Sequence, residues 1–196
     1  MFLRSGFTTD TNAMLGGDGG FLGRFADAEA AVGNATGAAK LRALASAIAD
    51  GVNEHLWASQ GAGADHYVTD WTGPPANATR DFVDYDANLI AAAHGLPSPT
   101  QASALFARID YGPRKGQCRP SATFVSERWY GPKDTTHGNI GDSWCAMGRI
   151  AWFDGLARRR YGDAQGFERY LPVELPQLWN ARLPEQNESA VLCTVT

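Results

Sequence analysis

The segment Arg80-Asp-Phe-Val-Asp-Tyr-Asp-Ala-Asn-Leu-Ile-Ala-Ala-Ala-His-Gly95 is the most informative part of this 196-residue chain. Its second half is rich in alanine and ends at a glycine, which predicts a short, buried helix from about Val83 to His94. Its first half places Asp81, Asp84 and Asp86 beside two aromatic residues. Aromatic faces stack on pyranose rings, and carboxylates bind hydroxyls or move protons. The segment therefore favours the binding and cleavage of sugars.

Composition excludes several classes of protein. An apolar content of 44% over 196 residues suffices for one domain with a substantial core. The 17 basic and 21 acidic residues give a net charge of −4, which offers no polybasic surface for nucleic acid or anionic lipid. No apolar run reaches the ~18 residues that a membrane-spanning helix needs. We therefore expect no nucleic-acid partner and no membrane partner.

The sequence also lacks motifs for a cofactor, a metal or an activated nucleophile. There is no phosphate loop, dinucleotide fingerprint or Gly-x-Ser-x-Gly elbow. The four histidines have no shared metal spacing, so we expect neither a cofactor nor a metal. Cys145 and His137 are a conceivable thiol pair, but the apolar surroundings of Cys145 favour a core position.

The sequence does not determine the cellular compartment of the protein. Asn34, Asn77 and Asn187 lie in Asn-X-Ser/Thr sequons, which mildly favour secretion as part of a longer precursor. The N-terminus lacks the pattern of a signal peptide. A disulfide between Cys118 and Cys145 is conceivable, and free thiols are somewhat favoured.

Hydrophobic periodicity predicts a helical domain over 1–171 and an irregular tail over 172–196. Three predicted helices are rich in small residues or apolar on all sides, and three are more amphipathic. The first set covers about 9–32, with a possible break at Gly16–Gly20, then 83–95 and 142–161. The second set covers 35–57, 98–110 and 163–171. This alternation is typical of the inner and outer helices of antiparallel hairpins.

Several side chains receive specific predictions. In helix 35–57 the expected buried stripe is Leu41, Leu44, Ile48, Val52 and Leu56. Phe25 is expected to face inward from the preceding helix, and Arg158-Arg-Arg160 is expected to be a solvated helix end. Ser98-Pro-Thr-Gln101 predicts a capping box. Asp10-Thr-Asn12 and Asp86-Ala-Asn88 form a faint internal echo, each opening an inner helix.

The loops that enter the inner helices are expected to meet at one end of the bundle. They are residues 4–10, 71–85 and 127–142, and they hold many of the aromatics and carboxylates of the chain. Each residue also has a structural alternative. Asp84, Asp86, Asp142 and Asp10 can be helix caps, and Trp71 can be a core residue at a strand end.

The chain resembles the six-hairpin glycosidases, whose catalytic domain is an (α/α)6 toroid. The resemblance rests on Ile48 to Trp57 leading into the short β segment Asp65–Asp70, on Asp84-Tyr-Asp-Ala-Asn88, and on Gly141 to Trp152. It implies an all-α fold of antiparallel helical hairpins, with short β segments in the loops. A complete toroid has twelve helices, so this chain corresponds to about half of one, and its exposed inner helices would favour self-association.

The resemblance implies hydrolysis of a glycosidic bond, with inversion, in an oligosaccharide or glycoside. Asp84 and Asp142 are the expected acid and base, with Glu127 in reserve. The expected sugar-binding residues are Asp81, Tyr85, Asp86, Arg128, Trp129, Tyr130, Trp71 and His137. Two alternatives remain: a truncated, non-catalytic carbohydrate-binding or scaffold fragment, and an α-toroid of another chemistry such as a terpenoid cyclase. The cyclase is disfavoured because the Asp-Asp pairs that bind magnesium diphosphate are absent.

Overall fold

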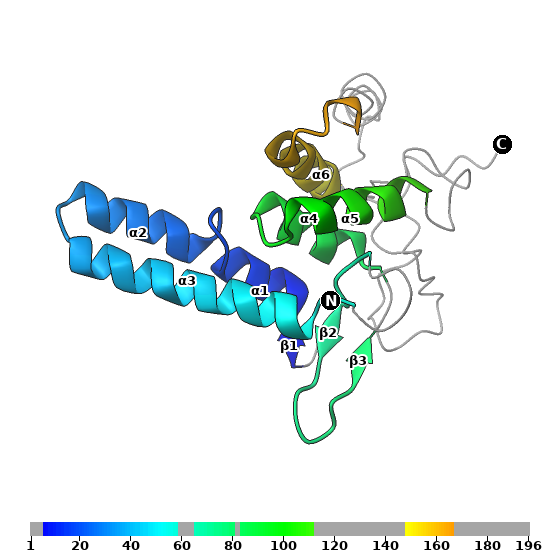
Figure 1. Cartoon of the computed structure of the whole chain (residues 1–196), viewed down its shortest axis with the longest axis horizontal. Helices are drawn as coiled ribbons and strands as arrows, with labels where there is room; N and C mark the ends of the chain where they lie inside the picture. Colours follow the sequence, from blue (N-terminus) through cyan, green and yellow to red (C-terminus); the bar gives the residue numbers. More distant parts are fainter. Residues whose placement is uncertain (1–5, 59–64, 81–82, 112–147, 167–196) are drawn as a thin grey trace, which may run out of the picture.

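The computed structural model describes residues 6–58, 65–80, 83–111 and 148–166 (Figure 1). Helices dominate this part of the chain. They are α1 (Thr9–Leu15), α2 (Phe21–Ala31), α3 (Ala35–His55), α4 (Tyr85–Ala93), α5 (Pro99–Tyr111) and α6 (Gly148–Tyr161). A small antiparallel sheet has the order β1 (Phe7–Thr8), β2 (Asp70–Trp71) and β3 (Thr79–Arg80). The prediction of an all-α class with short β segments is confirmed at this level.

The glycine run separates α1 from α2, as the sequence allowed. Gly17 lies so close to the end of α4 that an added Cβ would come within 2.7 Å of the His94 carbonyl oxygen. The backbone N–H of Gly19 donates to that same carbonyl at 3.2 Å. The run therefore lets the chain turn directly against the end of α4, where any side chain would be in the way.

Local capping signals set the other helix ends. Ser98 and Gln101 form the predicted capping box, with reciprocal side-chain to backbone hydrogen bonds of 3.3 and 2.8 Å. Gly95, with φ of +81°, follows α4 in the left-handed conformation that glycine adopts without steric cost. Asp163 accepts from the Gly166 N–H at 2.9 Å and opens a helical turn. The rest of the helix predicted to 171 lies outside the described residues, as do 142–147 and the tail 172–196.

Helix α4 is the centre of the domain. It packs against α1 on one side and α6 on the other, while α2 and α3 form a hairpin that projects from this body (Figure 1). Every residue from Tyr85 to Ala92 is buried. One core cluster joins α4 to α5 and α6, and a second joins it to α1, α3 and residues 67–68. The prediction of a short, buried helix from about Val83 to His94 is therefore confirmed, with the helix spanning Tyr85–Ala93.

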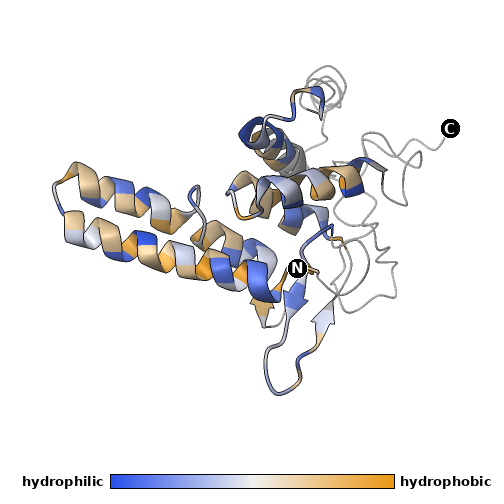
Figure 2. Ribbon diagram, viewed as in Figure 1, coloured by the Kyte–Doolittle hydropathy of each residue, from blue (hydrophilic) through white to orange (hydrophobic). Residues whose placement is uncertain are grey.

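Two predictions about side-chain burial are wrong. In the α2–α3 hairpin Phe25 is 60% exposed and Leu44 is 50% exposed, and the buried contacts are made by alanines such as Ala26 and Ala38. Figure 2 shows hydrophobic residues along both helices of this hairpin. Alanine recurs at the same helical period and allows the two helices to approach closely, so the larger side chains remain outside.

Helix α6 differs from its prediction as well. The sequence indicated a helix buried on most sides, but Trp152 is 63% exposed and Leu156 also reaches the surface. The Arg158 side chain, expected in solvent, is only 2% exposed, whereas Arg159 and Arg160 are exposed. One face of α6 therefore remains apolar and uncovered among the described residues.

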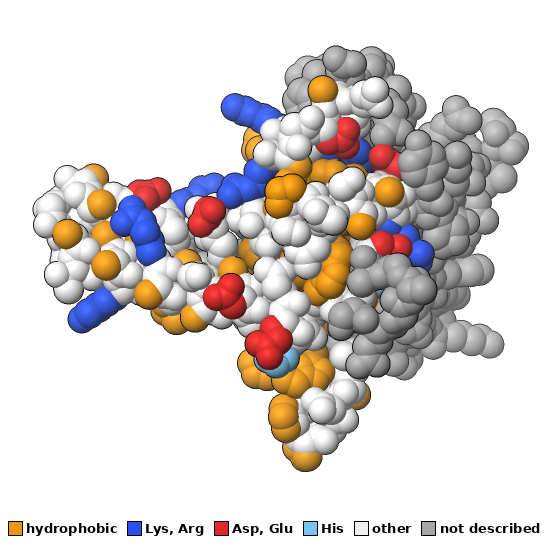
Figure 3. All heavy atoms as spheres, viewed as in Figure 1, with side chains coloured by type: hydrophobic (Ala, Val, Ile, Leu, Met, Phe, Trp, Pro, Cys, Tyr) orange, Lys and Arg blue, Asp and Glu red, His pale blue; other side chains and the backbone are white. Residues whose placement is uncertain are grey.

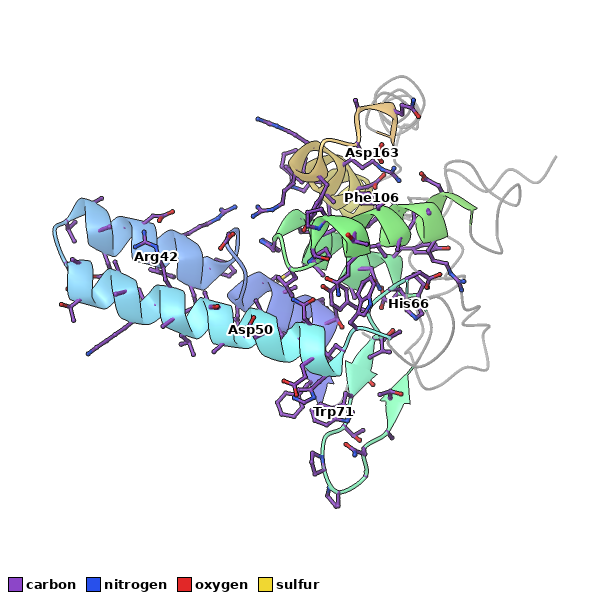
Figure 4. All side chains as sticks on the ribbon, in the orientation of Figure 1. Arg42, Asp50, His66, Trp71, Phe106 and Asp163 are labelled. Atoms are coloured by element: carbon purple, nitrogen blue, oxygen red, sulfur yellow. The ribbon has the colours of Figure 1, made fainter. Side chains whose placement is uncertain are left out.

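Arg158 is the cation of a buried cluster that joins α5 and α6. Its guanidinium donates to Asp154 at 2.8 Å, to Asp110 at 2.8 Å and to Asp163 at 2.6 Å. Its Cζ atom lies 5.0 Å from the centroid of the Phe106 ring, a cation–π contact. Asp163 and Phe106 mark the two sides of this cluster in Figure 4. Surrounding carboxylates raise the pKa of Arg158, so the guanidinium remains charged.

We expect the stability of the domain to fall as the pH rises through about 6, because of Asp154. Burial raises the pKa of Asp154 from 3.8 to about 6; Arg158 opposes this rise, and Asp110 and Asp163 add to it. Because the pKa of Asp154 is higher in the folded state than in the unfolded state, its protonated form stabilises the fold. This contribution to the free energy of unfolding is complete below pH 3.8 and is lost as the pH rises and Asp154 ionises in the folded protein. The loss is on the order of 2–3 kcal/mol.

Urea unfolding at several pH values between 4 and 7.5 measures this effect. Asp154→Asn keeps an oxygen that can accept from Arg158, so its stability relative to the wild type should increase with pH over this window. A constant difference between the two proteins would contradict the expectation.

Candidate functional site

Helices α1 and α4 run parallel and begin at the same short segment, Tyr67 to Thr69. At the start of α1, the Thr9 hydroxyl donates to the Val68 carbonyl at 2.5 Å, and the Thr9 N–H donates to the Thr69 carbonyl at 3.2 Å. At the other end, the turn after α1 contacts the end of α4 through His94 and Gly19. The described parts of the loops that enter these two helices therefore meet at one end of the domain, and the third loop of the prediction, 127–142, lies outside the described residues.

Asn88 ties α4 to that segment. Its side-chain oxygen accepts from the Tyr67 N–H at 2.7 Å, and its amide donates to the Tyr67 carbonyl at 3.0 Å. The same amide donates to the Asp84 carbonyl at 2.9 Å, within the first turn of the helix. The Asn88 side chain is fully buried, so it replaces water completely for the backbone groups it contacts.

The weak internal repeat between Asp10-Thr-Asn12 and Asp86-Ala-Asn88 is also seen in the structure. In α1, the Asn12 amide donates to the carbonyl of Thr8, four residues earlier, at 2.7 Å. Asn88 makes the same bond to Asp84 in α4. Thr8 and Asp84 are the N-cap residues of the two helices. The two helix starts are thus built alike, and Asp10 corresponds to Asp86.

Asp84, Asp86 and Tyr85 are all buried at the start of α4. Asp84 is its N-cap, and one carboxylate oxygen accepts from the Ala87 N–H at 3.1 Å. The structural alternative weighed for Asp84 is therefore correct, whereas Asp86 lies in the first turn and is not the cap. Tyr85 packs in the core with Leu89 and Leu105. Roles of these three residues in sugar chemistry remain predictions.

Trp71 lies in an aromatic group that sequence reasoning did not find. Its ring stacks on His55 with centroids 4.8 Å apart, and on Phe7 with centroids 5.6 Å apart. Its indole N–H donates to the Asn77 side chain at 3.0 Å. Phe7 and Trp71 meet because β1 and β2 pair in register. Figure 4 shows Trp71 below the end of α3, and Figure 3 shows apolar surface with a histidine at this tip.

Tyr67 supports the same end from within the core. Its hydroxyl donates to the Asn53 side chain at 2.6 Å, and its ring meets Trp57 edge to face. Burial raises the pKa of Tyr67 far above its usual range, so it stays protonated and serves as a hydrogen-bond donor. Buried contacts of Tyr67 therefore lie at the same end of the domain as the exposed aromatics.

The remaining predicted site residues lie outside the described part of the chain. They are Asp81, Glu127, Arg128, Trp129, Tyr130, His137 and Asp142, together with the three cysteines. Among the residues that are described, no three metal-ligating side chains gather as a metal site would require. No described helix has the length and hydropathy required to cross a membrane.

The chain matches no protein-family model and no curated protein sequence.

Proposed function

We propose that this chain is a glycoside-hydrolase-like helical-hairpin domain, which binds a carbohydrate where α1 and α4 begin and hydrolyses a glycosidic bond with inversion. The observation that carries the proposal is the placement of Asp84 and Asp86. Both are buried at the start of the central helix, Asp84 as its N-cap and Asp86 in its first turn, at the end where α1 also starts.

The architecture supports an incomplete (α/α)6 toroid. Helix α4 contacts α1 and α6, as an inner helix between two others would, and α3 and α5 precede α4 and α6 in the chain order, as outer helices would. The apolar face of α6 at Trp152 and Leu156 is where a further hairpin would pack. In this proposal that face is covered by another hairpin or by a second copy of the chain.

The chemistry assigned here needs two carboxyl groups on opposite sides of the scissile bond. In inverting enzymes one protonates the leaving oxygen and the other activates water, at a separation of roughly 6.5–9.5 Å. Asp84 is our candidate for one role, because its capping bond to the Ala87 N–H fixes the orientation of the carboxyl group. Asp142 is the candidate for the other, with Glu127 in reserve, and Asp86 would bind sugar hydroxyls.

We expect Asp84→Asn and Asp142→Asn each to lower kcat on a reactive aryl glycoside by about 10²–10⁴-fold, the usual contribution of a general acid or base. Asparagine also caps helices well, so Asp84→Asn should fold normally. Hydrolysis is measured over a panel of aryl glycosides, and circular dichroism confirms the fold. Asp50→Asn, an exposed substitution on α3, is the matched control. Full activity in both test variants would refute the assignment.

A second candidate is a domain that binds carbohydrate without cleaving it. The observation that favours it is the capping role of Asp84, which by itself accounts for an aspartate at this position. Isothermal titration with oligosaccharides, run beside the hydrolysis assay, separates the two. Binding without turnover supports the second candidate, and turnover supports the first.

A further inference from the structure

A pocket of about 300 Å³ opens between the end of α3 and the start of α1. Its floor is made by aliphatic residues of α3, including Val52, and by the backbone of Gly51. Its wall is made by Phe7, Trp71 and His55, three aromatic side chains that pack against one another. Its size is at the lower end of the range for small-molecule sites, which are concave and mostly apolar with few polar groups.

The lining indicates the chemistry of the ligand. Among the described lining residues, the polar side chains are those of Asn12 and His55, apart from the indole N–H of Trp71, which already donates to Asn77. A pyranose carries hydroxyls on most of its ring carbons, and burying them against aliphatic side chains would leave most without partners. A flat aromatic molecule matches the walls much better. One hydroxyl on it could be satisfied by Asn12 or His55.

We propose that this pocket binds a small planar aromatic molecule carrying a single hydroxyl, of the phenol or naphthol class. The ring lies against the Phe7–Trp71–His55 wall and the aliphatic floor of α3, and the hydroxyl pairs with Asn12 or His55. The site does not depend on glycoside hydrolysis, because neither Asp84 nor Asp86 lines it.

Gly51 provides a way to fill the pocket without harming the fold. A Cβ built on Gly51 would meet no atom within 4 Å, so a larger side chain can enter the open space. Glycine within a helix is less favourable than residues with side chains, so Gly51→Leu should not destabilise α3. The matched control is Ala43→Leu, which adds the same side chain at an exposed position of the same helix, away from the pocket.

The test uses the full chain and 2-naphthol, with binding followed by saturation-transfer NMR and by the shift of the Trp71 indole N–H signal. We expect a dissociation constant on the order of 1 mM or tighter. Gly51→Leu should weaken binding at least about tenfold, whereas Ala43→Leu should leave it unchanged. Phe7→Ala, which removes an exposed part of the wall, should weaken it as well.

Three results would overturn the proposal. They are the absence of saturable binding of 2-naphthol, equal affinity in Gly51→Leu and the wild type, and preferential binding of methyl glucoside in the same pocket. Glycosidase assays on the same variants keep this test separate from the proposed function. A naphthol site in a protein without hydrolytic activity would leave the pocket assignment intact.

Discussion

Arg158→Met is expected to lower the free energy of unfolding by about 3–5 kcal/mol at pH 7, the usual cost of removing one partner from a buried ion pair. Methionine fills similar space but donates no hydrogen bonds. Asp154, which is buried, loses its neighbouring cation, and Asp110 and Asp163 lose the guanidinium that they share. Urea denaturation followed by circular dichroism measures the loss.

The neighbouring residue provides the control. Arg159→Met removes the same charge one residue later, at an exposed position, and should change stability by no more than about 0.5 kcal/mol. The cost of Arg158→Met should also shrink at low pH, where Asp154 is protonated and no longer needs a cation. Equal effects of the two substitutions would show that the cluster does not hold α5 to α6.

Asn88→Ala is expected to cost about 2–4 kcal/mol, because three hydrogen bonds made by one fully buried side chain are lost together. The Tyr67 N–H and C=O then have no replacement for the amide, and a buried polar group left in this state costs about 1–3 kcal/mol. The measurement is again urea unfolding. Amide exchange should also accelerate at Tyr67 and in the first turn of α4.

Asn34→Ala is the comparison for this substitution. Asn34 is exposed and caps α3 through a single bond to the Gly37 N–H, so its replacement should cost about 1 kcal/mol. A loss at Asn88 no greater than the loss at Asn34 would mean that the Tyr67 contact contributes little.

The features that sequence predicted well were those set by local chemistry. Gly95 and the Ser98 capping box act within a few residues, so their positions follow from the residues themselves. The buried helix Tyr85–Ala93 also followed from composition, because a helix without a polar face has no side that favours water. The possible capping role of Asp84 was visible for the same reason.

The features that could not be predicted depend on contacts distant in sequence. Arg158 at the end of α6 looked solvated because its burial depends on α5, where one of its three partners, Asp110, lies 48 residues away. The aromatic wall of Phe7, Trp71 and His55 forms only when β1 pairs with β2, which brings Phe7 against Trp71. The hydrophobic periodicity of the sequence does not predict such a pairing. Phe25 was misplaced because alanines on the other face of its helix satisfy the same helical period.

The attachment of α1 to the segment around Thr69 has a consequence for the order of folding. A helix of seven residues is too short to persist alone in water, because nucleation costs more than so few hydrogen bonds return. The Val68 carbonyl that accepts from Thr9 lies 59 residues further along the chain. Because α1 precedes this partner in the chain, it becomes stable only after the segment around Thr69 has been synthesised. The folding of α1 therefore depends on a contact that is distant in sequence.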